Sequence, residues 1–591
     1  MDIPSNLLHN CSINSERQNI TVLSVMSPIG VALMVLSFVV LWLIGKLAIC
    51  VWWRPLMLER ELRRQGINGP PPLLLLGNYV EIIRLENIQR SIDMDAFRHD
   101  IFQRMLPFYT KWCKTYGRRF VFWEACEPRI AVTEPELIRE VFSSKLALAF
   151  GKSSLHQRCC ENLLGKGVAM ANGESWAHQR RTIAPAFHAD KLKGLAGIMM
   201  KCTEQTILRW ETSLQQAEAV GKDEVEVEIC HDFGVLTADI IACTEFGSSY
   251  DKGKRIFDLL TSLQELTLTF AHFVWLPGSR FLPTSWNRET WRLKREMEKL
   301  LKEIIEERRD LLKMGKIESY GDDLLGLMLT ESEGGSALGD SNHDISGIHS
   351  KRDKGHAAIR RPCFTTQQIM DECKTFFFAG HETTAGLLTW CILLLAAYPE
   401  WQEKARQEVL EVVGDIRHHE NGGRKQFTEL ADALPKMRTL GMIINETLRL
   451  YPPAIVITKY ALEDVRIGGD LKVPRGASVW VPVLAMHMDS ELWGTDAHLF
   501  RPERFQHGVA RACKHPLAFM PFAHGPRNCV GQAFAVMEAK IALSIILPRY
   551  SFSISPAYRH APITLLTLKP KHGAQVLLQR IRRQKEAPSP S

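Results

Sequence analysis

The sequence predicts a mainly α-helical protein with a minor β part, built as a single large domain behind an N-terminal transmembrane helix. Helical periodicity dominates residues 90–330, and in residues 291–312 charged side chains separate apolar positions spaced three and four residues apart. Strands are predicted at residues 456–460, 478–483 and 561–578. A chain of 591 residues with 46% hydrophobic content can bury a large core, which excludes a disordered or fibrous protein.

The N-terminal region has the features of a membrane anchor. Residues 18–45 contain no charged side chain, and such a stretch is long enough to cross the roughly 30 Å hydrocarbon layer as a helix. Basic residues are more frequent after it than before it, which by the positive-inside rule places the rest of the chain in the cytosol. We therefore predict a lumenal leader (1–21), a transmembrane anchor (22–45), a basic and Pro-rich linker (46–75), a large domain (76–580, with a flexible insertion at 331–362) and a disordered tail (581–591).

Other properties of this region stay open at the level of sequence. A cleaved signal peptide is the alternative to an anchor, although the apolar run exceeds the about 7–15 residues usual for such peptides and no clear A-x-A site follows. Met26 is a second candidate start of the protein. Asn10 and Asn19 begin glycosylation sequons that would face the lumen.

Charge and cysteine usage exclude several classes of function. The formal net charge of +7 comes from basic residues interspersed with acidic ones, without the Lys/Arg run of a nucleic-acid-binding patch. We therefore expect no nucleic-acid partner and a preference for anionic lipid or acidic protein surfaces. The 14 cysteines are scattered and form no C-x-x-C pair, which argues against a zinc module or a disulfide scaffold.

One cysteine, Cys529, lies in a turn-rich stretch with the features of an iron ligand. Residues 521–531 read PFAHGPRNCVG and lead into a predicted helix at residues 532–547. Loop amides and a helix N-terminus favour the thiolate form that binds iron. A lone loop cysteine is usually inert, but here every position of the pattern F-x-x-G-x-R-x-C-x-G is filled, at Phe522, Gly525, Arg527, Cys529 and Gly531.

This stretch resembles the haem-binding loop of the cytochrome P450 family. The resemblance implies a P450 haem domain at residues 76–580, with haem b as the cofactor and Cys529 as the ligand of its iron. It places Phe522, Arg527 and Gly531 among the residues that bind this cofactor. A thiolate in that position pushes electron density toward bound oxygen and favours O–O cleavage.

A second signature of the family lies midway along a long predicted helix at residues 365–397, which a capping box opens. Residues 379–384 match the pattern A-G-x-[DE]-T-[ST]. The resemblance implies that Thr383 orients bound dioxygen, that Glu382 helps to relay protons and that Gly380 leaves space for the ligand. Without the cysteine loop, the same residues would be an exposed acid and alcohol on a helix surface.

Two further signatures suggest how the haem is held. Glu446 and Arg449 form an E-x-x-R pair on one helix face, and with Arg504 they resemble the buried Glu-Arg-Arg cluster of the family, which implies a structural role beneath the cysteine loop. In isolation such a pair would be solvated and worth little. Trp176 and Arg180 match W-x-x-x-R, and the resemblance implies that both contact the haem propionates.

Two more basic residues complete this set. The resemblance implies that Arg527 is a further propionate partner. Lys459 occupies a position where relatives commonly have Arg, which implies a propionate contact there too. Basic residues around Lys540 and Arg181 are expected to dock an acidic redox partner.

The resemblance implies a monooxygenase that inserts one oxygen atom from O2 into a small, largely apolar plant metabolite. Electrons would come from NADPH through a separate NADPH-cytochrome P450 reductase, because the chain has no G-x-G-x-x-G fingerprint or flavin domain. The expected location is the endoplasmic reticulum membrane, crossed once, with the catalytic domain facing the cytosol.

Framework passages such as residues 278–283, 320–325 and 558–563 are similar to those of plant cytokinin hydroxylases, which favours an isopentenyladenine-type cytokinin as substrate. Residues 455–458, which are expected to line the pocket, differ from those enzymes. Gibberellin or diterpenoid oxidation and fatty-acid oxidation are the alternatives, because gibberellin-oxidising relatives share residues 176–181. A haem-thiolate isomerase or dehydratase without external electrons, and a non-catalytic haem sensor, are alternatives from other classes.

Overall fold

The computed structural model describes residues 28–94, 98–247, 250–270, 278–337, 364–414 and 424–581. The predicted leader (1–21), most of the predicted insertion (338–362) and residues 582–591 of the predicted tail lie outside this description.

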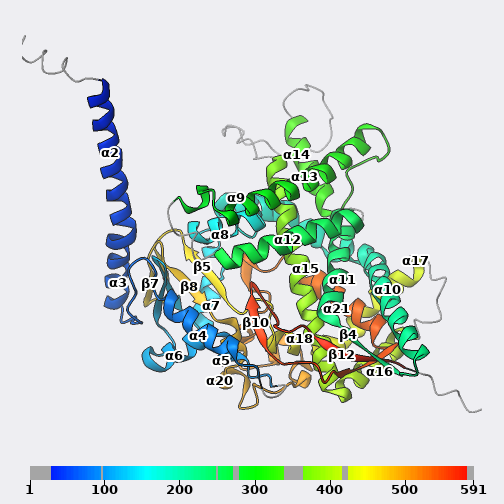
Figure 1. Cartoon of the computed structure of the whole chain (residues 1–591). Coiled ribbons are helices and arrows are strands. Elements are labelled where there is room, and N and C mark those ends of the chain that lie inside the picture. The colour runs from blue at the N-terminus through cyan, green and yellow to red at the C-terminus, as the bar shows by residue number, and fades with distance from the viewer. Residues whose placement is uncertain are drawn as a thin grey trace, which may run out of the picture.

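Helices make up most of the body (Figure 1). They are α2 (Pro28–Ala48), α3 (Arg54–Arg64), α4 (Tyr79–Ser91), α5 (Phe102–Met105), α6 (Pro107–Tyr116), α7 (Pro135–Val141), α8 (Ser154–Leu164), α9 (Gly173–Ile183), α10 (Ala189–Ala219), α11 (Ile229–Glu245), α12 (Tyr250–Phe270), α13 (Ser285–Lys313), α14 (Leu324–Ala337), α15 (Thr366–Ala397), α16 (Pro399–Val413), α17 (Arg424–Ala433), α18 (Arg438–Leu450), α19 (Val483–His487), α20 (Ser490–Trp493) and α21 (Gln532–Ile546). Helix α14 runs seven residues into the segment expected to be a flexible insertion from residue 331, so that its described part is helical.

The strands form several small sheets. They are β1 (Val121–Glu124), β2 (Glu127–Ala131), β3 (Phe150–Gly151), β4 (Glu224–Glu228), β5 (Ile457–Ala461), β6 (Val465–Ile467), β7 (Leu471–Val473), β8 (Ser478–Val481), β9 (Tyr550–Ile554), β10 (Pro562–Leu565), β11 (Thr567–Pro570) and β12 (Gln575–Arg580). A five-stranded sheet has the order β1-β2-β8-β5-β3, and only its β2/β8 pair is parallel. A second sheet has the order β4-β12-β9, and β6-β7 and β10-β11 are hairpins.

Two of the three predicted strands are confirmed as β5 and β8, but the third prediction was too simple. Residues 561–578 form three strands, β10, β11 and the first part of β12, because the chain turns twice within them. Leu566 turns the first hairpin with φ 65°, a conformation that sequence patterns rarely assign to leucine. Gly573, at φ 76°, makes the second turn.

The long helix predicted at residues 365–397 is confirmed as α15, which passes through the middle of the body (Figure 1). Its capping box is present: the Thr365 hydroxyl accepts the Gln368 N–H, and the Gln368 side chain accepts the Thr365 N–H. Pro399 begins the next helix after the cap at Tyr398. The C-terminal half of α15 is apolar on all sides and buried among other elements, including α11, α18, α21 and β9.

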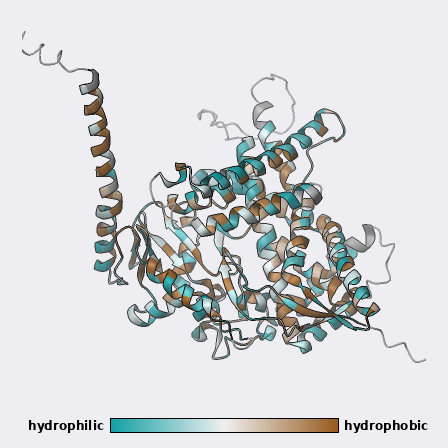
Figure 2. Ribbon diagram, in the orientation of Figure 1, coloured by the Kyte–Doolittle hydropathy of each residue, from teal (hydrophilic) through white to brown (hydrophobic). Residues whose placement is uncertain are grey.

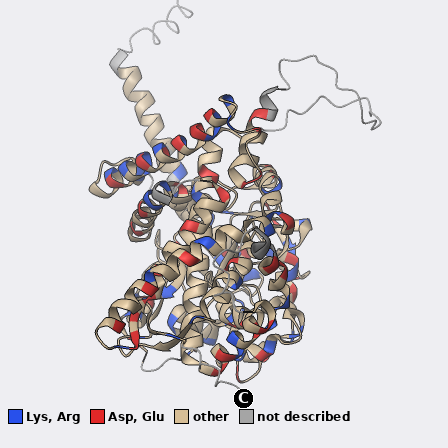
Figure 3. Ribbon diagram, turned by 90° about the vertical axis from the view of Figure 1, so that its right-hand side faces the viewer, with Lys and Arg blue, Asp and Glu red and all other residues tan. Residues whose placement is uncertain are grey.

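The N-terminal helix is apolar on all sides and exposed, and no charged residue interrupts it before Lys46 (Figures 2 and 3). It does not end at residue 45 as predicted. A π-helical turn (Ile49–Trp53) joins α2 to α3 just before Pro55, whose missing N–H breaks the regular ladder. The segment predicted to be a linker, 46–75, is therefore helical as far as Arg64.

Helix α3 is already part of the folded body. Leu62 is fully buried against the core of the five-stranded sheet. The Gln65 side chain donates to the Lys472 carbonyl at 3.0 Å and accepts the Lys472 N–H at 2.8 Å. These reciprocal bonds fix the end of the helix to β7.

Candidate active site

The loop that carries Cys529 is held by its own backbone. The Cys529 N–H donates to the Phe522 carbonyl at 2.9 Å, and the Asn528 N–H donates to the Gly525 carbonyl at 3.0 Å. Gly525 has φ 71°, and a Cβ added there would lie 1.8 Å from the Phe142 carbonyl oxygen, so that only glycine fits. The loop thus presents the Cys529 sulfur just before α21 begins.

The Cys529 side chain is accessible to solvent, although the surrounding protein is dense. Desolvation by this surrounding protein raises the pKa of the Cys529 thiol. A hydrogen bond from the Gly531 N–H and the positive charge of Arg180 lower that pKa. Sulfur that accepts an N–H bond and faces a cation is suited to bind a metal as thiolate, and a metal ion removes the proton outright.

The middle of α15 is less buried than the stretches of the helix on either side of it. Ala379 is exposed and Thr383 is partly exposed, between stretches that are almost fully buried. The Thr383 hydroxyl donates to the Ala379 carbonyl at 2.6 Å. Next to it, buried Thr384 lies near the buried carboxyl of Glu538 on α21, and α15 packs against this helix, which follows the cysteine loop.

Gly380 does not have the role that was expected for it. A Cβ at this position would lie 2.6 Å from Ile241 Cδ1 on α11. Its small size therefore allows α15 and α11 to pack closely, instead of making room for a ligand.

Glu382 is held through a single oxygen. Its Oε1 accepts from Lys569 Nζ at 2.9 Å, Thr567 Oγ1 at 2.8 Å and Gln264 Nε2 at 3.2 Å. Burial alone would raise the pKa of this carboxyl, but the charge of Lys569 and the hydrogen bonds from Lys569 and Thr567 on β11 outweigh it and lower the pKa below its ordinary value.

Helix α9 meets the cysteine loop through two arginines. Arg180 donates to the Asn528 carbonyl at 3.0 Å and to Asn528 Oδ1 at 2.8 Å. The Arg527 guanidinium stacks over the Trp176 ring at 4.1 Å and donates to the Ala171 carbonyl at 3.1 Å. The other two nitrogens of Arg527, Nε and Nη2, are buried and find no acceptor among the described residues.

Lys459 adds to an unbalanced group of cations. It is buried over the Phe142 ring at 4.6 Å. Burial, with the nearby charges of Lys152 and Arg527, lowers the pKa of Lys459 to about 7. None of these three cations forms an ion pair with an acidic side chain in the described part of the chain, so the group is suited to an anionic ligand.

Comparison with known proteins decides the family. A family model of cytochrome P450 matches residues 69–578. The chain is a cytochrome P450. Two Arabidopsis thaliana proteins named cytokinin hydroxylase are 46% and 45% identical to this P450 over 530 residues, which cover 90% of this chain and 94% of each relative. Cytochrome P450 734A6 of Oryza sativa subsp. japonica is 40% identical over 544 residues, 91% of this chain and 94% of that relative.

The solved structures agree on the fold. The crystal structure of a cytochrome P450DA heme domain matches with a TM-score of 0.63 at 24% identity, over 81% of this chain and 94% of that one. The predicted mainly α P450 fold is therefore confirmed. Membership of the family makes this chain a haem-iron monooxygenase that requires a redox partner and a small-molecule substrate.

The described residues fit the haem group of a P450. An accessible cysteine sulfur can bind the iron, and buried N–H groups of Arg527 without acceptors lie in a group of cations that suits carboxylates. The cations are not on one element: Lys459 lies on β5 and Arg527 in the cysteine loop. The fold brings them together from positions far apart in sequence.

We predict that the rate of haem loss depends on pH because of Lys459. The pKa of Lys459 lies below the ordinary 10.5, and pairing with a haem propionate would raise it, so that haem binding would take up a proton above about pH 7. We expect haem loss to an apomyoglobin trap to accelerate as the pH rises above this value. Lys459→Met should lose haem about tenfold faster below pH 7 and show a flatter pH profile. A Lys472→Met control on the surface should match the unmodified P450.

The Glu-Arg-Arg cluster is only partly as predicted. Arg449 Nε and Nη2 each donate to Glu446 at 2.7 Å, and both residues are completely buried. Arg504 Nε lies 3.6 Å from Glu446 and makes no hydrogen bond to it. Its other nitrogens bind the Trp493 carbonyl and Asp496, so that Arg504 mainly braces the neighbouring loop.

No sequence pattern indicated His487, which connects this cluster to the cysteine loop. Burial lowers the pKa of His487 to about 3, so the ring is neutral. Its Nδ1 donates to the Arg449 carbonyl at 3.0 Å, and its Nε2 accepts the Met520 N–H at 3.1 Å. Met520 lies just before Phe522, at the start of the loop.

A second acidic cluster, which the sequence analysis did not assign to the site, also supports it. Glu372 on α15 is fully buried and accepts the Val168 N–H with both oxygens, at 2.9 and 3.0 Å. Asp371 accepts the Lys166 N–H at 3.0 Å. Burial raises the pKa of Glu372 to about 8. These bonds fix the loop that precedes α9, and therefore the position of Trp176.

The expected docking role of Lys540 is not supported by its contacts. Lys540 Nζ donates to the carbonyls of Leu434 at 2.8 Å and Met437 at 3.1 Å, and so caps a neighbouring turn. Arg181 is exposed at the end of α9. Only the second of these two residues is available to a partner protein.

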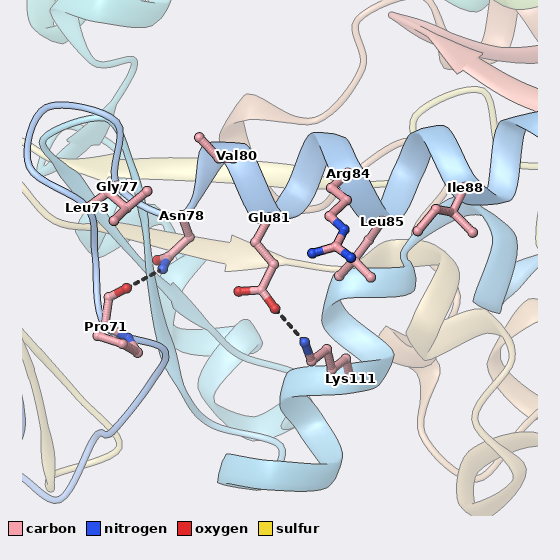
Figure 4. A pocket seen from close by; sticks show the side chains of 10 residues that line it. All are labelled: Pro71, Leu73, Gly77, Asn78, Val80, Glu81, Arg84, Leu85, Ile88 and Lys111. Atoms are coloured by element: carbon pink, nitrogen blue, oxygen red, sulfur yellow. Dashed lines mark hydrogen bonds and ion pairs between the residues drawn. The ribbon is translucent and has the colours of Figure 1, made fainter.

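A surface pocket of about 510 Å³ lies away from these residues (Figure 4). It is lined by Pro71, by residues of α4 and by Lys111 of α6, whose Nζ bonds Glu81 at 2.6 Å. None of the residues of the candidate active site lines it.

Proposed function

We propose that this P450 hydroxylates an isopentenyladenine-type cytokinin. The observation that carries the proposal is the 46% identity to a cytokinin hydroxylase over 90% of the chain. Electrons would come from NADPH through NADPH-cytochrome P450 reductase. The absence of any flavin or dinucleotide fingerprint in the sequence supports a separate reductase.

In the proposed haem site, the cysteine loop holds the ligand of the iron. Haem bound at Cys529 supplies the activation of dioxygen. The Phe522 carbonyl holds the Cys529 N–H, and the Gly531 N–H supports the sulfur. Arg180 braces the loop through Asn528.

The propionate side of the proposed site is cationic. Arg527 and Lys459 bind the propionates, and Trp176 fixes the plane of the Arg527 guanidinium by stacking. Glu446, Arg449 and Arg504 keep a structural role, which they exert through His487 and the loops they brace.

On α15, we assign Thr383 to the oxygen-binding side of the haem and Glu382 to proton delivery. The exposed surface around Ala379 and Thr383 in an otherwise buried helix supports this assignment. Proton transfer by a positioned side chain typically contributes a factor of about 10²–10⁴ to a rate.

Thr383→Ala is expected to retain haem and the thiolate spectrum while product formation falls at least about tenfold and peroxide rises. The hydroxyl that orients oxygen is lost, but the helix is not, since the side chain bonds only the Ala379 carbonyl. Product and peroxide per NADPH measure this effect. Thr383→Ser should restore coupling. Equal coupling in Thr383→Ala and the unmodified enzyme would remove Thr383 from the mechanism.

The proposed membrane arrangement is a single crossing of the endoplasmic reticulum membrane by the N-terminal helix, with the haem domain in the cytosol. The exposed apolar surface of α2 and the Lys46 that ends its uncharged stretch support it. Protease treatment of sealed microsomes should digest the haem domain and leave the leader, with its sequons at Asn10 and Asn19, protected.

A substrate screen in reductase-bearing microsomes tests the proposal. Isopentenyladenine nucleotides, gibberellins and fatty acids are compared for NADPH-dependent hydroxylation. Hydroxylation of the cytokinins alone supports the proposal. Preferential turnover of gibberellins or fatty acids would contradict it and would assign that class of molecule as the substrate. Conversion of a substrate without NADPH and reductase would indicate an isomerase or dehydratase instead.

A further inference from the structure

The β10-β11 hairpin contacts the acid of α15 directly. Thr567 and Lys569 are two residues apart on β11, so their side chains lie on the same face of the strand. Both donate to Oε1 of Glu382. The hairpin is also fixed to α15 by a hydrogen bond from Trp390 Nε1 to the Leu568 carbonyl at 3.4 Å, so its position relative to the helix is defined.

Among the groups around Glu382, Lys569 is the one that stabilises its ionised form most strongly. His381 lies beside it on α15, but burial lowers the pKa of His381, so that its ring is neutral near pH 7. Cys230 on α11 faces the pair, and burial raises the pKa of its thiol to about 11. Gln264 on α12 and Thr567 are uncharged donors. A charge-assisted bond from Lys569 is therefore the strongest of the three.

The two carboxylate oxygens of Glu382 differ in their hydrogen bonds. All three donors, Lys569, Thr567 and Gln264, bind Oε1. None of the described residues donates to Oε2. One oxygen of Glu382 is therefore fixed by three donors, while Oε2 accepts no hydrogen bond from the described residues.

We propose that Lys569 is a positioning residue for proton delivery, which holds Glu382 ionised and oriented through Oε1 and leaves Oε2 as the oxygen that takes up and releases the proton. This inference rests on the role proposed for Glu382. In coupled turnover, a pair of electrons from NADPH and two protons leave one oxygen atom in the product and the other in water. The same electrons and protons give hydrogen peroxide when delivery is misplaced, so that an error in positioning appears as peroxide in place of product.

The test compares Lys569→Met with Lys569→Arg in the full-length holoenzyme. Infrared pH titration, with Glu382→Gln to identify the signal, reports the carboxyl of Glu382 directly. Lys569→Met should raise its titration midpoint by about one pH unit or more, because the burial of the acid is no longer opposed by the ammonium. Peroxide per NADPH should rise several-fold, and its pH profile should move upward by the same interval. Lys569→Arg should restore both.

Lys571→Met is the matched control, because Lys571 lies next to the same strand but contacts Arg90 and Asp93 instead of Glu382. It should leave both readouts unchanged. If Lys569→Met loses the reduced carbon monoxide spectrum and so fails to fold, Thr567→Val removes another donor from the same oxygen and should raise the midpoint to a smaller extent.

The outcomes separate this inference from the proposed function. An unchanged carboxyl titration in a folded Lys569→Met variant, or an equal effect of Lys571→Met, would overturn the inference about Lys569. Unchanged peroxide in Glu382→Gln would overturn the proton-delivery role of Glu382 itself. The identity of the hydroxylated substrate affects neither readout, since peroxide and NADPH are measured with any molecule that is turned over.

Discussion

Cys529→Ala is expected to abolish the absorption band that thiolate-ligated haem gives when it is reduced and bound to carbon monoxide. The band depends on a thiolate ligand to the haem iron, which Cys529 would supply, and alanine would offer no donor in its place. Because the Cys529 backbone bonds to Phe522 do not involve the side chain, the loop should keep its shape. Monooxygenase activity should fall to background, since the push of the thiolate on the O–O bond is lost.

Cys513→Ala provides the control for this prediction. Cys513 lies in the same region of sequence; its sulfur donates to the His515 carbonyl at 3.1 Å, and its side chain packs against the small apolar cluster around Trp493 and Phe505. It should keep the band and the activity. A band that persists in Cys529→Ala would show that another residue binds the iron.

Glu446→Ala is expected to cause the largest loss of stability among the residues of the site, about 3–5 kcal/mol. The substitution leaves the guanidinium of Arg449 buried without its bidentate carboxylate. It also removes the acceptor of the Arg501 N–H, at 2.8 Å. Since a haem protein of this size can unfold irreversibly, the half-life of the thiolate spectrum at a fixed temperature is the appropriate measurement.

The same pair of residue types at the same spacing on the surface supplies the control. Glu289 and Arg292 form an ion pair at 2.6 Å on α13, and both are more than 40% exposed. Glu289→Ala should change the stability by no more than about 0.5 kcal/mol. If the two substitutions shorten the half-life equally, the buried cluster does not support the cysteine loop.

The parts of the site that depend on local sequence could be predicted. The cysteine loop has a fixed run of turn-formers, the capping box is four residues long, and the Glu446–Arg449 contact follows from helical spacing. In each case, the partners lie within about ten residues of each other. Their geometry is therefore set by the local backbone, which sequence patterns describe.

The contacts between distant segments could not be predicted in this way. His487 is 38 residues from Arg449, and Lys569 is 187 residues from Glu382. Neither residue stands out in composition or spacing. Gly380 was assigned to the ligand because the sequence cannot tell which neighbour its missing Cβ faces, and the structure shows Ile241. Only the packing of helices and hairpins decides such questions.

The clamp between Gln65 and β7 fixes the C-terminal end of the N-terminal helical stretch to the catalytic body. The 35 residues from Gly30 to Arg64 extend for about 50 Å at 1.5 Å per residue, well beyond the roughly 30 Å of a hydrocarbon layer. In the proposed membrane arrangement this helix would act as a stiff stalk, and a tilt of it in the bilayer would tilt the catalytic domain as well. Encounters with a partner in the same bilayer would accordingly be limited to rotation about the bilayer normal and lateral diffusion.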